Sequence, residues 1–564
     1  MDLSIRVSGA AGQGIETLGS LLTGAFAGMG LHVFTTETYM SRIRGGLNWM
    51  DIRIGDYELL SGKEIPDLLV VLDPQSLSFL RERTNEWTLL LLNGPPTVGT
   101  VAIDFAQEAK ALTGEVVMAN AVAAGSVFAL LGYDAARLHS LLDAQFARKG
   151  QDVVDANMRC AQRGAELAEP YVGAKLPPKG VGAPDFVCSG SEAIGLGAAT
   201  AGVKFVAAYP MTPSTGTFTY LANVADEFGI VVEQAEDEIA AVNMICGATY
   251  AGVPAMTTTS GGGFALMVEG LALAGMLELP ILISLGQRPG PATGLPTRTG
   301  QQDLKFALYA GHGEFPRALF APGTIPQAYE LTRRALQTAH QFQSPVILLT
   351  DQFFVDVQKN VPRLDDAPDY VDRCILTDAG GDYVRYAVTD TGVSPRAIPG
   401  GSAFVVVDSD EHTEDGHITE DLRARVRLQD KRQAKGKGMM EDALPPEYYG
   451  PRAPQRLLIT WGSTYGPARE AVDLLHESGE SVGMLHFSQV WPINAKKIRQ
   501  LADMAGFDLA RADHVISVEG NATGQFASIL RESGLLRECR LLLRYDGLPF
   551  TGEEIAGRLS DEIH

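Results

Sequence analysis

Residues 208–317 carry glycines, hydroxyls and carboxylates at the ends of apolar runs. In chain order the segments are AYPMTPST, EQAEDEIAAVNMICGA, TTTSGGG, GQRPGPATGLPTRTGQQD and HGEFPR. An α/β sheet binds its ligand at the carboxyl ends of its strands, so these side chains are expected to meet there. The pattern predicts a polar cofactor held against an apolar wall, with one carboxylate acting on it. The chain is therefore predicted to be an enzyme.

Four acidic residues stand between a predicted strand and a predicted helix: Glu233, Glu236, Asp237 and Glu238. Acids at a helix start favour the helix dipole, so capping explains part of this cluster. Four carboxylates are nevertheless more than a cap needs. Because the following residues, IAAVNMICGA, are apolar, burial would raise the pKa of an acid here toward neutrality, as proton exchange with a cofactor nitrogen requires. Capping and catalysis both stay open.

The neighbouring turns allow a structural and a functional interpretation as well. Thr212 is predicted to cap a helix with Pro213 at its first position, while its hydroxyl could also face a ligand. Gly261, Gly262 and Gly263 follow the strand TTT and form either a tight turn or a place where a ligand approaches the backbone closely.

Arg288 directly follows the predicted strand PILISLGQ, where a guanidinium suits a carboxylate substrate through paired hydrogen bonds. Arg298, in the loop that follows, fits a surface role better. His312 is expected to be a structural histidine. Residues 519–525, EGNATGQ, predict either a capped turn or a polar seam against the second domain.

The N-terminal strand LSIRVS runs into Gly9, Gly12 and Gly14 and then a helical stretch. This spacing, G-x-x-G-x-G, is not the dinucleotide fingerprint G-x-G-x-x-G, so NAD binding is weakly supported. What remains is a helix N-terminus suited to an anionic group. Arg42 and Arg44 precede two glycines, which leaves the backbone there able to turn toward a partner or ligand.

Composition limits the classes of function. The chain has 564 residues, and its formal charge is 46 − 68 = −22, which repels a nucleic-acid backbone. Its five cysteines contain no C-x-x-C pair, which excludes a zinc ribbon and argues against a metal or iron–sulfur cluster held by this chain alone. Scattered thiols, no signal peptide and no membrane span predict a cytoplasmic protein.

Three α/β domains are expected, as a sequence of this length allows. The first combines strands at 67–73 and 88–93 with a helical run at 119–148. In the second, helices alternate with β-branched strands, which predicts a parallel sheet with both faces covered. An acidic, basic and proline-rich stretch between the second and third is predicted to be an exposed, mobile linker. The predicted bounds are 1–178, 186–400, 401–452 for the linker, and 453–564.

The order of these motifs resembles the 2-oxoacid:ferredoxin oxidoreductases, specifically the α subunit of the 2-oxoglutarate type with a γ domain fused in front. GAAGQGIETLG and SRIRGG resemble the γ domain. The segments from AYPMTPST to HGEFPR resemble the thiamine-diphosphate pyrimidine-binding domain. WGSTYGPAREA and VEGNATGQ resemble the transketolase C-terminal-like domain. The resemblance covers nearly the whole chain.

The resemblance implies decarboxylation of a 2-oxoacid on thiamine diphosphate, electron transfer through iron–sulfur clusters to ferredoxin, and release of an acyl-CoA. It assigns the carboxylate that hydrogen-bonds the aminopyrimidine ring to Glu238, with Glu236 as the alternative. Thr212 and Arg288 would face substrate and cofactor. The region of Gly12, Gln13 and Gly14 would help to hold coenzyme A.

The family's G-D-G…N motif for magnesium and diphosphate is missing from the sequence, as are cluster-binding cysteines. The resemblance therefore implies a β subunit that supplies the diphosphate half of the site, Mg²⁺ and a [4Fe-4S] cluster, in a dimer of αβ heterodimers. Alone, the chain is expected to be inactive.

Two alternatives remain open. The substrate could be another 2-oxoacid, such as pyruvate or a branched-chain acid, although the R-I-R-G-G and E-F-P-R neighbourhoods resemble the 2-oxoglutarate branch more closely. The chain could also be a noncatalytic subunit that binds CoA or a nucleotide, in which case the acidic cluster would only cap a helix.

Overall fold

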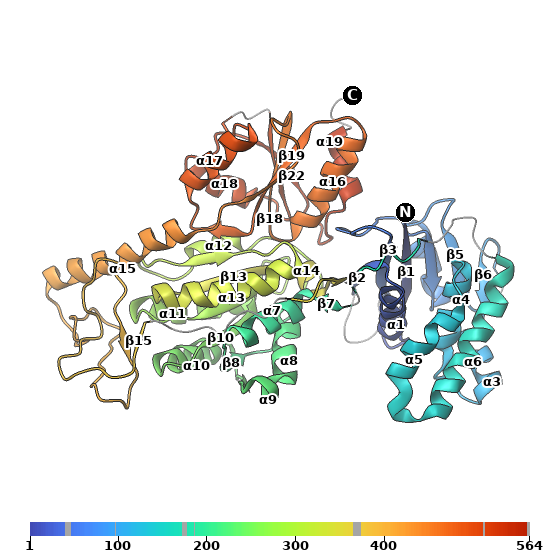
Figure 1. Cartoon of the computed structure of the whole chain (residues 1–564), viewed down its shortest axis with the longest axis horizontal. Coiled ribbons are helices and arrows are strands. Elements are labelled where there is room, and N and C mark those ends of the chain that lie inside the picture. Colours follow the sequence, from blue (N-terminus) through green and yellow to red (C-terminus); the bar gives the residue numbers. More distant parts are fainter. Residues whose placement is uncertain are drawn as a thin grey trace. The chain divides into compact units, whose positions relative to one another are not determined.

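The computed structural model describes residues 1–39, 47–95, 97–171, 178–184, 186–364, 374–510 and 514–560. The chain forms two compact units, whose elements are labelled in Figure 1. Unit 1 comprises Met1–Ser189, Val357–Arg363 and Thr551–Glu553, and unit 2 comprises Gly190–Asp356, Leu364–Phe550 and Glu554–His564. The second and third predicted domains thus share unit 2, where each has its own sheet.

Unit 1 is built on a sheet in the order β6-β5-β4-β1-β3-β2-β14-β7. The central strand β1 pairs in parallel with β4 and antiparallel with β3. Alternate residues of β1, such as Ile5 and Val7, are fully buried, which explains why this short apolar run lies at the centre of the sheet. The strand bounds are β1 Asp2–Ala10, β2 His32–Thr38, β3 Leu47–Gly55, β4 Leu68–Val71, β5 Leu89–Asn93, β6 Val101–Ile103, β7 Val187–Ser189 and β14 Gln358–Asn360.

The predicted helical run 119–148 is interrupted in unit 1. Helix α4 (Ala119–Leu130) ends before Gly132, whose φ of 78° is left-handed, and α5 (His139–Phe146) follows a separate turn. Helix α6 (Gln151–Ala168), which the sequence analysis did not identify, packs on α4. A Cβ at Gly125 would overlap the backbone of Ala161, so glycine is required for this close approach.

Two short strands from distant parts of the chain complete the sheet of unit 1. β7 and β14 pair antiparallel with each other, and β14 also pairs with β2. Asn360 fixes this edge, since its side chain accepts from the N–H of Val33 at 3.0 Å and donates to the carbonyl of Leu31 at 2.8 Å. The predicted start of the second domain near residue 186 therefore needs correction, because residues 187–189 belong to the first sheet.

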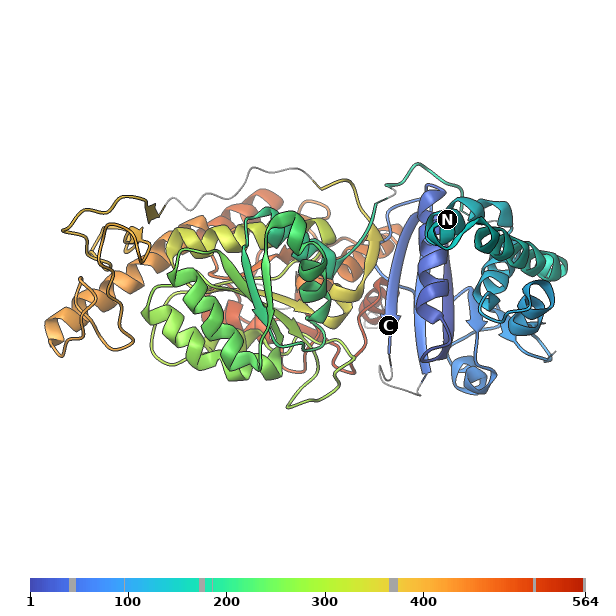
Figure 2. The same ribbon diagram turned by 90° about the horizontal axis from the view of Figure 1, so that it is seen from below.

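The first sheet of unit 2 has the order β20-β12-β13-β11-β10-β8-β9, and the strands from β12 to β9 run parallel. Helices α10 and α11 pack on one side, while α7, α8 and α13 form a second group, as Figure 2 shows. The predicted α/β class with a covered parallel sheet is confirmed. The bounds are α7 Gly190–Thr200, β8 Phe205–Ala208, α8 Thr215–Asn223, β9 Val231–Gln234, α10 Glu238–Tyr250, β10 Ala255–Ser260, α11 Gly261–Met276, β11 Leu282–Gln287, α12 Leu304–Tyr309, β12 Ala318–Phe320, α13 Ile325–Phe342, β13 Val346–Asp351 and β20 Gln489–Trp491.

The second sheet of unit 2 has the order β17-β19-β18-β21-β22. Apart from the antiparallel edge strand β17, its strands are parallel. Strand β20, from this part of the chain, pairs antiparallel with β12 of the first sheet. The bounds are β17 Glu447–Tyr449, β18 Arg456–Trp461, α16 Tyr465–Glu477, β19 Val482–Phe487, α17 Ala495–Ala505, β21 Val515–Glu519, α18 Gln525–Glu532, β22 Arg540–Leu543 and α19 Gly552–Ser560. Across the described ranges, no helix combines the length and apolar character that a membrane span needs.

The prediction of an exposed linker over residues 401–452 was wrong for its second half. Residues Leu422–Asp442 form helix α15, capped by the side chain of Asp421, and Glu447–Tyr449 form β17. The basic residues Lys431 and Lys435, which suggested a solvated stretch, are buried. The sequence could not reveal this burial because their acidic partner lies far away in the chain.

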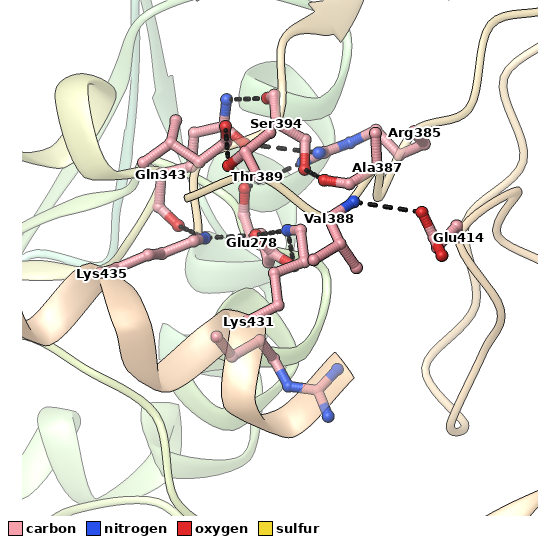
Figure 3. A network of polar contacts seen from close by, with 12 residues as sticks. Glu278, Gln343, Arg385, Ala387, Val388, Thr389, Ser394, Glu414, Lys431 and Lys435 are labelled. Carbon is pink, nitrogen blue, oxygen red and sulfur yellow. Dashed lines mark hydrogen bonds and ion pairs between the residues drawn. The ribbon is translucent and has the colours of Figure 1, made fainter. Parts of the chain in front are cut away.

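That partner is Glu278, in the turn between α11 and β11 (Figure 3). Nζ of Lys431 lies 2.8 Å from both carboxylate oxygens of Glu278, and Lys435 forms a second ion pair with the same group. Lys435 also donates to the carbonyl of Gln343 at 3.1 Å. Burial alone would raise the pKa of Glu278, but the charges of Lys435, Lys431 and Arg385 outweigh it and lower this pKa to about 2. The carboxylate is thus ionised and anchors α15.

Candidate active site

Predicted site residues follow three parallel strands of the first sheet of unit 2, namely β8, β10 and β11. Strands β8, β10, β11 and β13 pair in parallel, so their carboxyl ends lie along one edge of the sheet. The turns that follow contain Thr212 after β8, Gly261 after β10 and Arg288 after β11. This is the edge where a sheet of this kind binds its ligand.

The acidic cluster before α10 separates into different roles. Asp237 is the helix cap, because its side chain accepts a hydrogen bond from the N–H of Ala240 at 2.7 Å. Glu233 and Glu236 are exposed. Glu238 is only 3% exposed, and its Oε1 is buried without a hydrogen-bond partner among the residues that the structure describes. A buried carboxyl oxygen without a partner is costly, and a ligand that donates to it would remove that cost.

Glu238 lies against the first turn of α11. A Cβ at Gly263 would stand 2.8 Å from the Cδ of Glu238, so the glycine makes room for the carboxyl group. A Cβ at Gly262 would meet no atom closer than the carbonyl of Ala292 at 4.0 Å, which leaves that side of the turn open. The glycine trio is therefore the start of a helix beside a carboxylate rather than a separate loop.

A second carboxyl group, that of Asp303, lies against the same turn. A Cβ at Gly261 would stand 2.8 Å from the Cγ of Asp303. Oδ2 of Asp303 is buried and has no hydrogen-bond partner in the described ranges. Burial raises the pKa of Asp303 to about 6, against the opposing charge of Arg288. No role was predicted for this aspartate, although it directly follows Gln301 and Gln302 in the motif GQQD.

Arg288 and Thr212, predicted to face the ligand together, are in contact. Nη1 of Arg288 donates to the carbonyl of Thr212 at 2.7 Å. Burial lowers the pKa of Arg288, against the opposing charge of Asp303, yet the group stays a cation at neutral pH. The predicted capping role of Thr212 was wrong, because α8 begins only at Thr215.

The turn after β8 lies directly over the end of β11. A Cβ at Gly286 would stand 2.8 Å from the Cγ of Pro213, which explains the glycine at this position of the strand. The side chain of that glutamine, Gln287, donates to the carbonyl of Thr350 at 3.1 Å and accepts from the N–H of Asp303 at 3.0 Å. The end of β11 thus fixes both Arg288 and Asp303.

Residues at the end of the second sheet of unit 2 form hydrogen bonds with the residues that precede α12. Gln301 exchanges two hydrogen bonds with Gly520, at 2.7 and 2.8 Å, and donates to the carbonyl of Trp461 at 2.9 Å. Gln525 donates to the carbonyl of Gln302 at 2.7 Å. Both interpretations of residues 519–525 therefore hold, since the segment is a capped turn and also a polar seam.

A small pocket lies beside these contacts. Its polar lining includes Thr299, Asp351, Ser463 and Arg544. Asp351 is saturated, because Thr299, Ser463 and the N–H of Phe354 all donate to it. The pocket thus offers a ligand few unsatisfied groups.

The remaining predicted residues lie elsewhere. Gly12 and Gly14, in unit 1, have left-handed φ angles of 89° and 79° at the start of α1 (Ile15–Gly28), and Gln13 accepts from the N–H of Ala10 at 2.8 Å. Arg42 and Arg44 lie outside the described residues. His312 is exposed, which differs from the structural role predicted for it.

Two family models match this chain. The thiamine-diphosphate-binding part of pyruvate flavodoxin/ferredoxin oxidoreductase matches residues 196–431, and pyruvate ferredoxin/flavodoxin oxidoreductase matches residues 4–167. The first match contains the edge that carries Glu238 and Arg288, and the second covers most of unit 1.

Curated proteins and solved structures agree with these matches. The 2-oxoacid:ferredoxin oxidoreductase subunit alpha of Sulfolobus sp is 30% identical over 98% of this chain and 96% of its own length. The 2-oxoglutarate oxidoreductase subunit KorA of Mycobacterium tuberculosis is 28% identical over 99% of this chain and 92% of its own. The structure of 2-oxoglutarate:ferredoxin oxidoreductase from Magnetococcus marinus, with 2-oxoglutarate, coenzyme A and succinyl-CoA bound, covers 100% of both chains at a TM-score of 0.91 and 30% identity. The chain therefore belongs to the 2-oxoacid:ferredoxin oxidoreductase family, as an α subunit with the γ-type domain fused in front.

Proposed function

We propose that the chain is the α subunit of a 2-oxoglutarate:ferredoxin oxidoreductase. The reaction converts 2-oxoglutarate, CoA and oxidised ferredoxin into succinyl-CoA, CO₂ and reduced ferredoxin, with two electrons leaving the substrate, and it is reversible. The preference for 2-oxoglutarate is supported by full-length similarity to the Magnetococcus marinus enzyme and to the mycobacterial KorA subunit.

The observation that carries the catalytic part of the proposal is the buried, unpartnered oxygen of Glu238 beside Gly263. A carboxylate in this setting fits a ring nitrogen of the aminopyrimidine of thiamine diphosphate, because the ring can supply the missing partner and the glycine lets it come close. When bound, thiamine diphosphate supplies the carbon that accepts the 2-oxoacid and the electron sink for CO₂ loss. Glu238 would hold and exchange the proton at the pyrimidine nitrogen.

Arg288 would bind the carboxylate next to the oxo group of the substrate. Its guanidinium has five N–H groups, and one bond, to Thr212, is formed in the described structure. The contact orients the guanidinium and leaves donors for paired hydrogen bonds to a carboxylate. Gly261 and Gly262 would lie against the cofactor, with Gly262 at the open side of the turn.

The β subunit would complete this site. We expect it to hold the diphosphate through Mg²⁺ and to carry the [4Fe-4S] cluster that passes electrons to ferredoxin, in a dimer of αβ heterodimers. In this chain, the glycine loop of unit 1 around Gly12, Gln13 and Gly14 would help to hold CoA, because its left-handed glycines precede a helix N-terminus suited to phosphate.

The substrate is tested with the complex of this chain and its β subunit. Reduction of methyl viologen is measured with 2-oxoglutarate, pyruvate and branched-chain 2-oxoacids, each with CoA. A site that binds a second carboxylate should favour 2-oxoglutarate in kcat/KM by about tenfold or more. A higher kcat/KM for pyruvate would move the chain to another branch of the family.

A further inference from the structure

The second carboxyl group of the site is that of Asp303, and side chains from two other elements hold the backbone around it. Its backbone N–H donates to Gln287 at 3.0 Å, and the preceding Gln302 is held through its carbonyl by Gln525. Lys305, two positions on, donates its backbone N–H to the same Gln525 at 2.9 Å. Strand β11, through Gln287, and helix α18, through Gln525, therefore position the aspartate, as expected for a functional group held in advance of binding.

This carboxyl group belongs to a residue held beside Arg288, because the N–H of Asp303 donates to the side chain of Gln287, the residue before Arg288. Burial raises the pKa of Asp303, and the charge of Arg288 acts in the opposite direction. Burial lowers the pKa of Arg288, and there the charge of Asp303 acts in the opposite direction. Among the described residues, Oδ2 of Asp303 has no hydrogen-bond partner. An anionic ligand at Arg288 would thus lie near a carboxyl group that has an unpartnered oxygen.

We propose that Asp303 is a positioning residue that sets the charge available to the 2-oxoacid at Arg288 and takes up one proton when the 2-oxoacid binds. Ionised, Asp303 offsets the guanidinium charge and weakens binding of the substrate carboxylate. Protonated, it leaves the full charge of Arg288 to the substrate. The proton comes from solvent and goes to the Asp303 carboxyl group. The inference rests on the proposed role of Arg288 in carboxylate binding.

Other charged groups around Asp303 are compatible with this titration. Glu238 lies on the other side of the glycine turn, Lys305 follows on α12, and Asp351 ends β13. Lys305 is paired with Glu532, and Asp351 is saturated with donors. Asp303 has a pKa of about 6, so it is mostly ionised at pH 7–8 before the substrate binds.

The first test is the pH dependence of KM for 2-oxoglutarate in the assembled enzyme. Between pH 6 and 8.5, the uptake of one proton should raise KM of the wild type by up to about tenfold per pH unit, with a smaller change in kcat. In the Asp303→Asn variant the side chain keeps its shape but cannot titrate. The KM of this variant should therefore stay, over the whole pH range, near the value that the variant has at pH 6. Glu532→Gln, which removes an exposed acid near the same helix, should keep the wild-type profile.

The second test measures the proton directly. Binding of 2-oxoglutarate to the complex freed of thiamine diphosphate is followed by calorimetry in two buffers of different ionisation enthalpy. Uptake of up to one proton at pH 7.5 in the wild type, and its loss in Asp303→Asn, would agree with the proposal. The proposal would be overturned if the wild type took up no proton. It would also be overturned if the wild type and Asp303→Asn showed equal proton uptake and equal pH profiles of KM. A different result would show that the proposed function itself is wrong: a wild-type complex that neither binds nor turns over 2-oxoglutarate.

Discussion

Glu238→Gln in the assembled enzyme is expected to lower kcat by about 100- to 10,000-fold, the usual contribution of a group that transfers a proton. The glutamine amide has the same shape, but it cannot exchange a proton with the cofactor ring. Because Oε1 of Glu238 lacks a hydrogen-bond partner in the described structure, replacing the carboxyl group should not reduce the melting temperature. The measurement combines viologen reduction with a thermal melt of the same sample.

Glu236→Gln is the matched control, since it changes the same functional group two positions earlier on an exposed side chain. It should leave kcat within about twofold, as surface substitutions away from a site usually do. Unchanged turnover in Glu238→Gln would contradict a catalytic role and favour a noncatalytic subunit. Equal losses in both variants would contradict the assignment of the catalytic carboxylate to Glu238.

Glu278→Gln is expected to have the largest effect on stability. Removing the carboxylate leaves Lys431 and Lys435 buried without their counter-charge, which typically costs about 3–5 kcal/mol. We expect a lower melting temperature and faster hydrogen exchange in α15, because the ion pairs of Glu278 with Lys431 and Lys435 anchor this helix. Replacing Glu278, Lys431 and Lys435 together by Met should recover much of this loss, because the two buried lysine charges are removed together with the carboxylate.

Arg427→Gln on the same helix is the control. Its ion pair with Glu414 is exposed, so its loss should change the free energy of unfolding by no more than about 1 kcal/mol. The wild type should also lose the contribution of Glu278 as the pH falls from about 4.5, its ordinary pKa, toward about 2, its pKa in the fold. A Glu278→Gln variant with wild-type stability and unchanged exchange in α15 would show that the network does not anchor the helix.

Local patterns in the sequence predicted most of the parallel sheet in unit 2. The predicted strand PILISLGQ contains β11, and the predicted strand TTT lies within β10. Elements that depend on distant partners were not predictable in this way. β14 is recognised only through its pairing with β2 and β7, and α15 depends on Glu278, more than a hundred residues earlier.

The same distinction applies to the site. The motif AEDEIAA indicated a carboxylate at the start of a helix, but one sequence could not separate Glu236 from Glu238. Their burial separates them, because one is exposed and the other lies against Gly263. Asp303 escaped notice since its significance comes from the turn at Gly261, which is distant in sequence and adjacent in space.

We propose that the catalytic site is complete only when a β subunit joins this chain. The most direct measurement compares 2-oxoglutarate-dependent reduction of methyl viologen by the purified chain, by the β subunit and by their mixture, each with thiamine diphosphate, Mg²⁺ and CoA. We predict turnover in the mixture and none above background in either component. Sustained turnover by this chain alone would contradict the shared site.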